Sequence, residues 1–153
     1  MYRNRPALAA LGDWLFPDAH LSLKTSAQVR DGANSPVTRH VEQFMALASE
    51  TATLAQRIQK PLALKQIMYP WDGADEASPE SQRYFIAEVL DCLGSPEAGL
   101  NLPVAYVVHS AYDAPWKRGG PFHPWDPYTG LLDSNGTPRP AVGEIVRRKW
   151  YPT

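Results

Sequence analysis

Apolar residues recur along this chain with two spacings, one typical of amphipathic helices and the other of buried strands. Helical spacing predicts four helices, over residues 6–16, 36–59, 79–93 and 140–149. Three shorter apolar runs have the length and composition of strands, at residues 19–25, 62–69 and 103–112. Helices and strands alternate strictly, which indicates an α/β fold with a parallel sheet covered by helices.

The two central helices carry boundary signals of their own. A serine that can cap free amides stands before a proline at the first helical position at Ser35 and again at Ser78. Pro61 ends the first of these helices, and Gly94 ends the second. The sequence therefore places one helix on each side of the apolar run 62–69.

The loops that follow parallel strands lie on one face of the sheet, because the crossover connections are right-handed, and this face carries the chemistry of such folds. Two of these loops combine carboxylates with aromatic side chains: Tyr69, Trp71, Asp72, Asp75 and Glu76 in the first, and Asp113, Trp116, Lys117, His123, Trp125 and Asp126 in the second. The mixture suits the binding and cleavage of carbohydrate. A structural interpretation stays open, since Asp72 begins a turn sequence and Glu76 favours the start of the next helix.

Length and charge exclude several classes of partner. The 153 residues are enough for one domain, residues 1–153, with a substantial core. The formal net charge of −1 gives no electrostatic case for nucleic acid or an anionic membrane. No apolar run approaches the roughly 18 residues of a membrane span, and the basic N-terminus lacks the apolar stretch of a signal peptide. We expect neither partner, and the compartment stays open.

The sequence contains no recognisable motif for a metal, cofactor or nucleophile. Its four histidines lack metal-ligand spacing, and there is neither a Gly-rich phosphate loop nor a Gly-x-Ser-x-Gly motif. The single cysteine, Cys92, excludes an internal disulfide and falls on a predicted helix. We therefore expect no metal and no cofactor.

Three segments resemble family-17 glycoside hydrolases, the β-1,3-glucanase and glucanosyltransferase group. Residues 60–71 are similar to the seventh strand of that family, where a Lys-Pro-led strand ends in Glu, a short gap, an aromatic residue and Pro. Residues 111–117 resemble the Phe-Asp-x-x-Trp-Lys segment of its eighth strand, and residues 130–140 resemble its closing Gly-Leu-Phe-Asp…Gly-x-Pro-Lys-Pro. The resemblance implies the last units of a (β/α)₈ barrel, with about three parallel strands and a β-glucan ligand.

The same resemblance shows where catalytic groups are missing. It puts Gln66 at the position of the nucleophilic glutamate, and an amide cannot form the glycosyl ester. The general acid of the family follows an asparagine, and this chain contains no Asn-Glu pair. Residual catalysis would therefore have to use Asp72, Asp75, Glu76 or Asp113, from one subunit or from two.

A full barrel of this kind has at least about 200 residues, so 153 residues correspond to about half a barrel. An opened barrel has unpaired strand edges and an uncovered apolar inner face. We therefore expect a homodimer or a larger assembly.

Two functions are consistent with these observations. The first is a glycoside hydrolase-related protein that acts on β-glucan by hydrolysis or transglycosylation, with weak or lost activity. In it, Tyr69, Trp71, Trp116 and Trp125 would stack on sugar rings, while Lys117 and His123 would hydrogen-bond hydroxyl groups. The second is a non-catalytic carbohydrate-binding or structural half-barrel that assembles as an oligomer. Gln66 favours the second function most directly.

Overall fold

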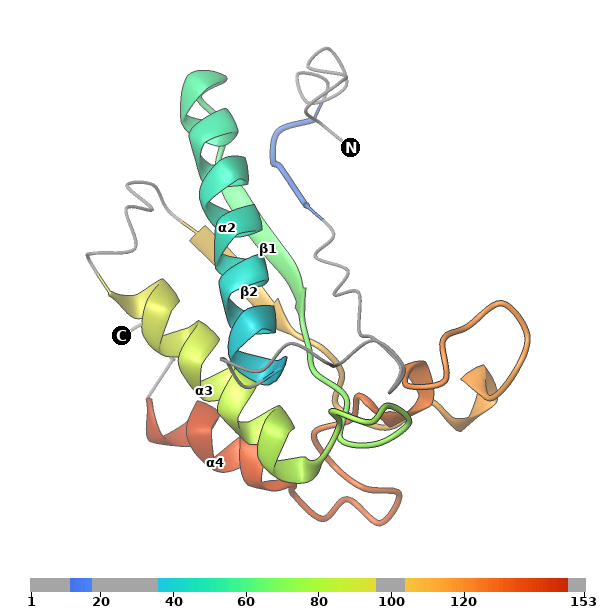
Figure 1. The fold of residues 1–153 in the computed structure, drawn as a ribbon. Helices are drawn as coiled ribbons and strands as arrows, with labels where there is room; N and C mark the ends of the chain where they lie inside the picture. The colour runs from blue at the N-terminus through green and yellow to red at the C-terminus, as the bar shows by residue number, and fades with distance from the viewer. Residues whose placement is uncertain (1–11, 18–35, 96–103, 149–153) are drawn as a thin grey trace.

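A computed structural model describes residues 12–17, 36–95 and 104–148 of the chain. In it two parallel strands, β1 (Leu62–Ile67) and β2 (Val104–Val108), form the sheet. The helices α2 (Pro36–Arg57) and α3 (Pro79–Gly94) flank the sheet, and α4 (Pro140–Arg147) packs on α3 (Figure 1). The predicted α/β class with parallel strands and flanking helices is confirmed.

The core lies between the sheet, α2 and α3. Leu62, Leu64 and Ile67 of β1 are buried, as expected for a strand that is covered on both faces. The residues of α2 and α3 that are buried with them are Val37, Val41, Phe44, Ala48, Ala52, Ala55, Phe85, Ile86, Val89 and Leu90. These residues form the hydrophobic core of the described part of the chain.

The predicted boundaries of the helices agree closely with the structure. The Oγ of Ser78 accepts a hydrogen bond from the backbone N–H of Ser81 at 3.0 Å, and Pro79 is the first residue of α3. α2 begins at Pro36 and α4 at Pro140, both as expected. The sequence signals at these three helix starts are local, so the fold leaves them unchanged.

The predicted N-terminal helix over residues 6–16 is wrong in the part that is described. Leu15 instead forms a parallel bridge with Leu62: its N–H donates to the Pro61 carbonyl at 3.0 Å, and its carbonyl accepts from the Ala63 N–H at 2.8 Å. The free edge of β1 offers these unpaired backbone groups, and pairing with them outweighs weak helical spacing. The predicted strand at residues 19–25 lies outside the described residues.

The sheet bends where β1 ends. Leu62, Ala63 and Leu64 pair with Val104, Ala105 and Tyr106, and the register then shifts before Ile67 pairs with Val108. The residue inside this irregularity, Gln66, has a φ of 63°, in the left-handed region that few non-glycine residues adopt. The bulge thus redirects the chain just before it enters the first loop.

Candidate functional site

The loops after β1 and β2 meet, as the parallel topology requires. The backbone N–H of Trp71 donates to the Tyr128 carbonyl at 2.9 Å, and its indole Nε1–H donates to Oδ1 of Asp113 at 2.9 Å. The rings of Trp71 and Tyr128 also meet edge to face at 5.3 Å. Two segments about 50 residues apart in sequence therefore form one surface at the carboxyl ends of the strands (Figure 1).

Asp113 is the centre of this junction. Its Oδ1 also accepts the Gly130 N–H at 2.9 Å, and its Oδ2 forms an ion pair with Nη2 of Arg139 at 2.6 Å. The Arg139 guanidinium in turn lies 4.1 Å from the centre of the Trp71 ring. Asp113 is thus committed to holding three segments together, and Arg139 covers one face of the Trp71 ring.

Gln82 of α3 makes a second connection between the loops. Its side chain is fully buried, and its Nε2 donates to the carbonyls of Tyr69 at 2.9 Å and Gly130 at 3.2 Å. One amide group therefore satisfies a buried backbone acceptor from each loop and fixes their separation.

Gln66 stands at the end of β1, between these loops and the core. Its Oε1 is buried, and no donor within the described part of the chain hydrogen-bonds it. A buried carbonyl oxygen without a donor is unfavourable, as is the left-handed backbone at this residue. Features of this kind concentrate at functional sites, where a bound ligand can supply the missing partner.

Polar side chains of the first loop and of α2 form a buried cluster. Tyr69 is fully buried, and its hydroxyl lies 3.2 Å from Nδ1 of His40. The Glu76 carboxylate, only 3% exposed in its side chain, lies 3.5 Å from His40 and 3.7 Å from Arg39. Burial and then the charge of Glu76 raise the pKa of the Tyr69 hydroxyl well above its usual value. The Tyr69 ring therefore belongs to the core and does not face solvent.

The second loop exposes large aromatic side chains. We name residues 112–128 the aromatic loop; it contains the 3₁₀ helices η4 (Pro115–Lys117) and η5 (Asp126–Tyr128). Trp116 is 76% exposed, Tyr112 56% and Phe122 45%. Trp125 is buried instead and stacks on His123 with ring centres 4.6 Å apart. The rings available to a ligand are therefore largely those of Trp116, Tyr112 and Phe122.

The remaining candidate acids are at the surface. Asp72 and Asp75 are exposed, and Oδ1 of Asp72 accepts the Gly73 N–H at 2.7 Å. A Cβ at Gly73 would meet the Pro124 carbonyl at 2.5 Å, and the φ of 82° also requires glycine. Asp72 and Gly73 therefore form a turn that lets the first loop pass close to the aromatic loop.

In the described ranges, no group of three or more His, Cys, Asp or Glu side chains lies close enough together to hold a metal ion. None of the helices in these ranges is long and apolar enough to span a bilayer.

Several residues of this surface were not among the candidates from sequence. Tyr112 and Phe122 are large apolar residues in or next to a loop rich in Gly and Pro, a pattern that could have indicated their exposure. Gln82 and Arg139 carry no such signal, because each acts through contacts with residues 13 to 68 positions away.

Solved structures similar to this chain include three carbohydrate-active enzymes. The first is an active-site mutant of a Rhizomucor miehei β-1,3-glucanosyltransferase in complex with laminaritriose, at 21% identity and a TM-score of 0.49 over 69% of this chain. A second structure, of a glycoside hydrolase family 17 β-1,3-glucanosyltransferase from the same organism, has 20% identity and a TM-score of 0.44 over 66%. Xylanase 10B from Thermotoga petrophila, in complex with xylobiose, has 19% identity and a TM-score of 0.44 over 70%.

The chain spans about a third of the length of these proteins, 36%, 36% and 31% respectively. No protein-family model and no curated protein matches it. Family 17, which the sequence motifs resemble, thus appears among the similar structures.

Proposed function

We propose that this chain binds a β-linked glucan at the carboxyl ends of β1 and β2 and does not cleave it. The exposure of Trp116, Tyr112 and Phe122 on one loop is the observation that carries the proposal. Several large exposed side chains on one loop are typical of a binding surface, and flat rings suit the apolar faces of sugar rings. The laminaritriose bound in one similar structure makes a β-1,3-glucan the first ligand to test.

Polar groups beside these rings would fix the orientation of the sugar. Lys117 and His123 lie on the aromatic loop itself and could donate hydrogen bonds to sugar hydroxyls. Trp71 takes part with one ring face at most, because Arg139 covers the other. A few polar groups around an apolar surface are the usual composition of a small-molecule site.

Two of the candidate acids have structural partners and the position of the family nucleophile is an amide, which is why we propose binding without cleavage. Retaining glycosidases need two carboxyl groups about 5–5.5 Å apart, one of them a nucleophile. Gln66 is an amide, Asp113 is paired with Arg139, and Glu76 is buried beside His40 and Arg39. We propose that these acids hold the loops in place rather than attack a glycosidic bond.

The Trp116→Ala variant tests the proposal. Loss of the most exposed ring should weaken laminarin binding about fivefold or more, as expected for an aromatic contact of about 1 kcal/mol. Titration calorimetry measures this change. Trp14→Ala is the matched control, because Trp14 is 43% exposed but adjoins Leu15, at the start of β1 and thus at the opposite end of the sheet. Equal affinity in Trp116→Ala and the wild type would contradict the proposal.

A reducing-sugar assay on β-glucans separates binding from hydrolysis. We expect no product from the wild type. Product formation that is lost in Asp72→Ala, Glu76→Ala or Asp113→Ala would instead show a hydrolase that uses acids outside the family positions.

A further inference from the structure

The aromatic loop also carries positive charge. Lys117 and Arg118 are consecutive residues, and no acidic residue occurs between Pro115 and Trp125. Nζ of Lys117 lies 5.9 Å from the centre of the Phe122 ring, and Cζ of Arg118 lies 5.5 Å from the centre of the Tyr128 ring. Both cations are therefore in contact with aromatic side chains of the same loop.

This charge is not neutralised within the described part of the chain. There Lys117 and Arg118 form no ion pair, whereas Arg83, Arg139 and Arg148 all pair with carboxylates. The acids nearest in sequence have other contacts: Asp113 pairs with Arg139, and Oδ2 of Asp126 accepts the His123 N–H at 2.9 Å. The loop thus presents two cations without ion pairs, Lys117 beside the exposed Phe122 ring and Arg118 beside the half-buried Tyr128 ring.

We propose that the aromatic loop prefers a glucan that carries anionic groups, such as carboxylates, over a neutral glucan. The inference rests on the proposed function, since the rings would hold the sugar chain while Lys117 and Arg118 pair with its charged substituents. An Arg guanidinium matches a carboxylate with two parallel hydrogen bonds, which an exposed Arg118 is free to make.

The small number of cations favours a substituted sugar over a nucleic acid or a lipid surface. Binding of nucleic acids depends on many phosphate contacts, and binding of anionic membranes on clusters of basic residues. Here two cations stand in a chain of net charge −1. They are enough for a local contact and too few for attraction to a polyanion at a distance.

The test compares laminarin with carboxymethyl-laminarin of matched length by titration calorimetry, on the whole chain. We expect the carboxylated glucan to bind about three- to tenfold tighter at about 0.05 M salt, the range that two surface ion pairs give. At about 0.5 M salt most of this preference should be screened. In Arg118→Gln the preference should fall about threefold, with laminarin affinity little changed.

Arg57→Gln is the matched control, because Arg57 is exposed and ends α2 at the top of Figure 1, far from the aromatic loop. Lys117→Gln is the second variant if circular dichroism shows that Arg118→Gln is unfolded. Because Lys117 is also proposed to contact the neutral sugar, this variant is judged by the ratio of the two affinities, which should fall about threefold. Equal affinity for the two glucans, or a preference that survives both substitutions, would overturn the inference and leave glucan binding intact. Failure to bind either glucan would overturn the proposed function with it. Tighter binding of a single-stranded oligonucleotide or of phosphatidylglycerol vesicles would assign the cations to a different partner.

Discussion

Gln66 has a left-handed backbone conformation and a buried side-chain oxygen, Oε1, that accepts no hydrogen bond within the described part of the chain. Its φ of 63° costs a non-glycine residue about 1 kcal/mol, and its Oε1 is buried without a donor in the described part of the chain. These two costs fall on the one residue that the family resemblance puts at the nucleophile position.

Replacing Gln66 by Glu should destabilise the protein at neutral pH. The substitution would bury a negative charge where the amide oxygen now lacks a donor, so we expect a loss of about 1–3 kcal/mol in the free energy of unfolding at pH 7. Burial raises the pKa of such a carboxyl above its unfolded value, so the loss should shrink as the pH falls below that pKa and the group becomes neutral. Urea denaturation between about pH 4 and 7 measures the trend. A constant difference across this range would contradict it.

Among the secondary-structure elements, α3 fixes the positions of the two loops relative to each other. The buried side chain of Gln82 in α3 donates to backbone carbonyls that follow β1 and β2. The Asp113 carboxylate connects the same two segments by accepting from Trp71 and Gly130. The surface proposed to bind sugar is therefore formed before any ligand arrives.

The Gln82→Leu variant should separate these loops. It removes a donor and leaves two buried carbonyl groups unsatisfied, which should cost about 2–4 kcal/mol in the free energy of unfolding. Amide hydrogen exchange in residues 69–77 and 128–132 should accelerate more than exchange in α2. Gln56→Leu, at an exposed position of α2, is the control and should change neither measurement. Uniform acceleration over the whole chain would indicate general destabilisation instead.

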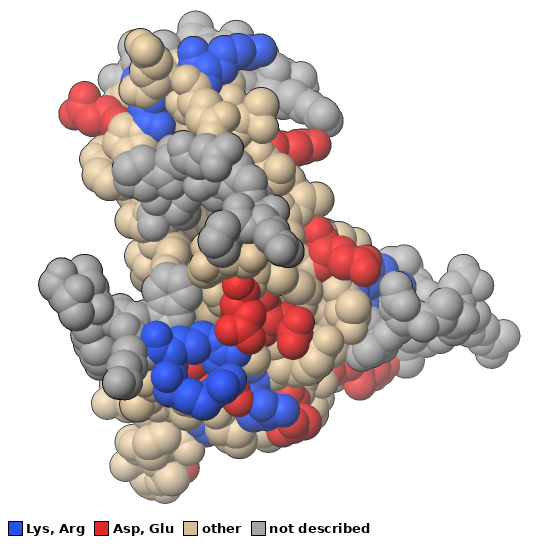
Figure 2. Space-filling model, turned by 90° about the vertical axis from the view of Figure 1, so that its left-hand side faces the viewer, with Lys and Arg blue, Asp and Glu red and all other residues tan. Residues whose placement is uncertain are grey.

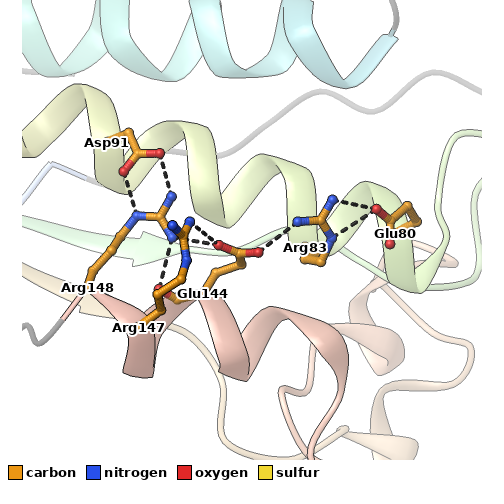
Figure 3. Close-up of polar contacts among 6 residues, drawn as sticks. All are labelled: Glu80, Arg83, Asp91, Glu144, Arg147 and Arg148. Carbon is orange, nitrogen blue, oxygen red and sulfur yellow. Dashed lines mark hydrogen bonds and ion pairs between the residues drawn. The ribbon is translucent and has the colours of Figure 1, made fainter.

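Ion pairs join α3 and α4 in addition to the apolar contacts of Ala141 and Ile145 with the core. Glu144 accepts hydrogen bonds from Arg147, Arg148 and Arg83 at 2.8, 2.7 and 2.7 Å, and Arg148 also pairs with Asp91 (Figure 3). These three arginines lower the pKa of Glu144 from its usual 4.5 to about 2. Basic and acidic side chains accordingly lie side by side on the face that Figure 2 shows.

Glu144 should make the stability depend on pH. Because its folded pKa is depressed, its contribution is present above pH 4.5 and is lost as the pH falls toward 2. We expect Glu144→Gln to lower the free energy of unfolding by about 1–2 kcal/mol at pH 7, since solvent screens these surface pairs, and to match the wild type near pH 2. Thermal unfolding at several pH values tests this. Glu42→Gln, at an exposed position of α2, is the control.

Within the described part of the molecule, β2 has one edge without a partner strand. Among the described strands it pairs only with β1, and Val107 is 55% exposed. An exposed apolar strand next to an open edge is a site of association. These features support the homodimer expected from the sequence, which stays a prediction, as does the half-barrel.

Val107→Lys should weaken this association. A charge on the apolar strand should shift the dimer to monomer in sedimentation velocity at micromolar concentration, with the fold retained. Ala46→Lys adds the same charge at an exposed position of α2 and should leave the dimer unchanged. A wild-type protein that sediments only as a monomer would remove the prediction.

The local features of this protein can be predicted from short stretches of its sequence. Capping serines, prolines and apolar periodicity placed the starts of α2, α3 and α4, and the apolar run of β1 predicted a buried parallel strand. These signals act within a few residues, so they do not depend on the rest of the fold.

Features that depend on contacts between distant residues became visible only in the folded chain. Leu15 joined the edge of β1 instead of a helix, Tyr69 and Trp125 became buried, and Asp113 became a structural partner of Arg139. A side chain's exposure and partners are set by segments far away in sequence, which no local pattern encodes. The candidate acids were therefore visible in the sequence, but their commitment to holding the loops together was visible only in the fold.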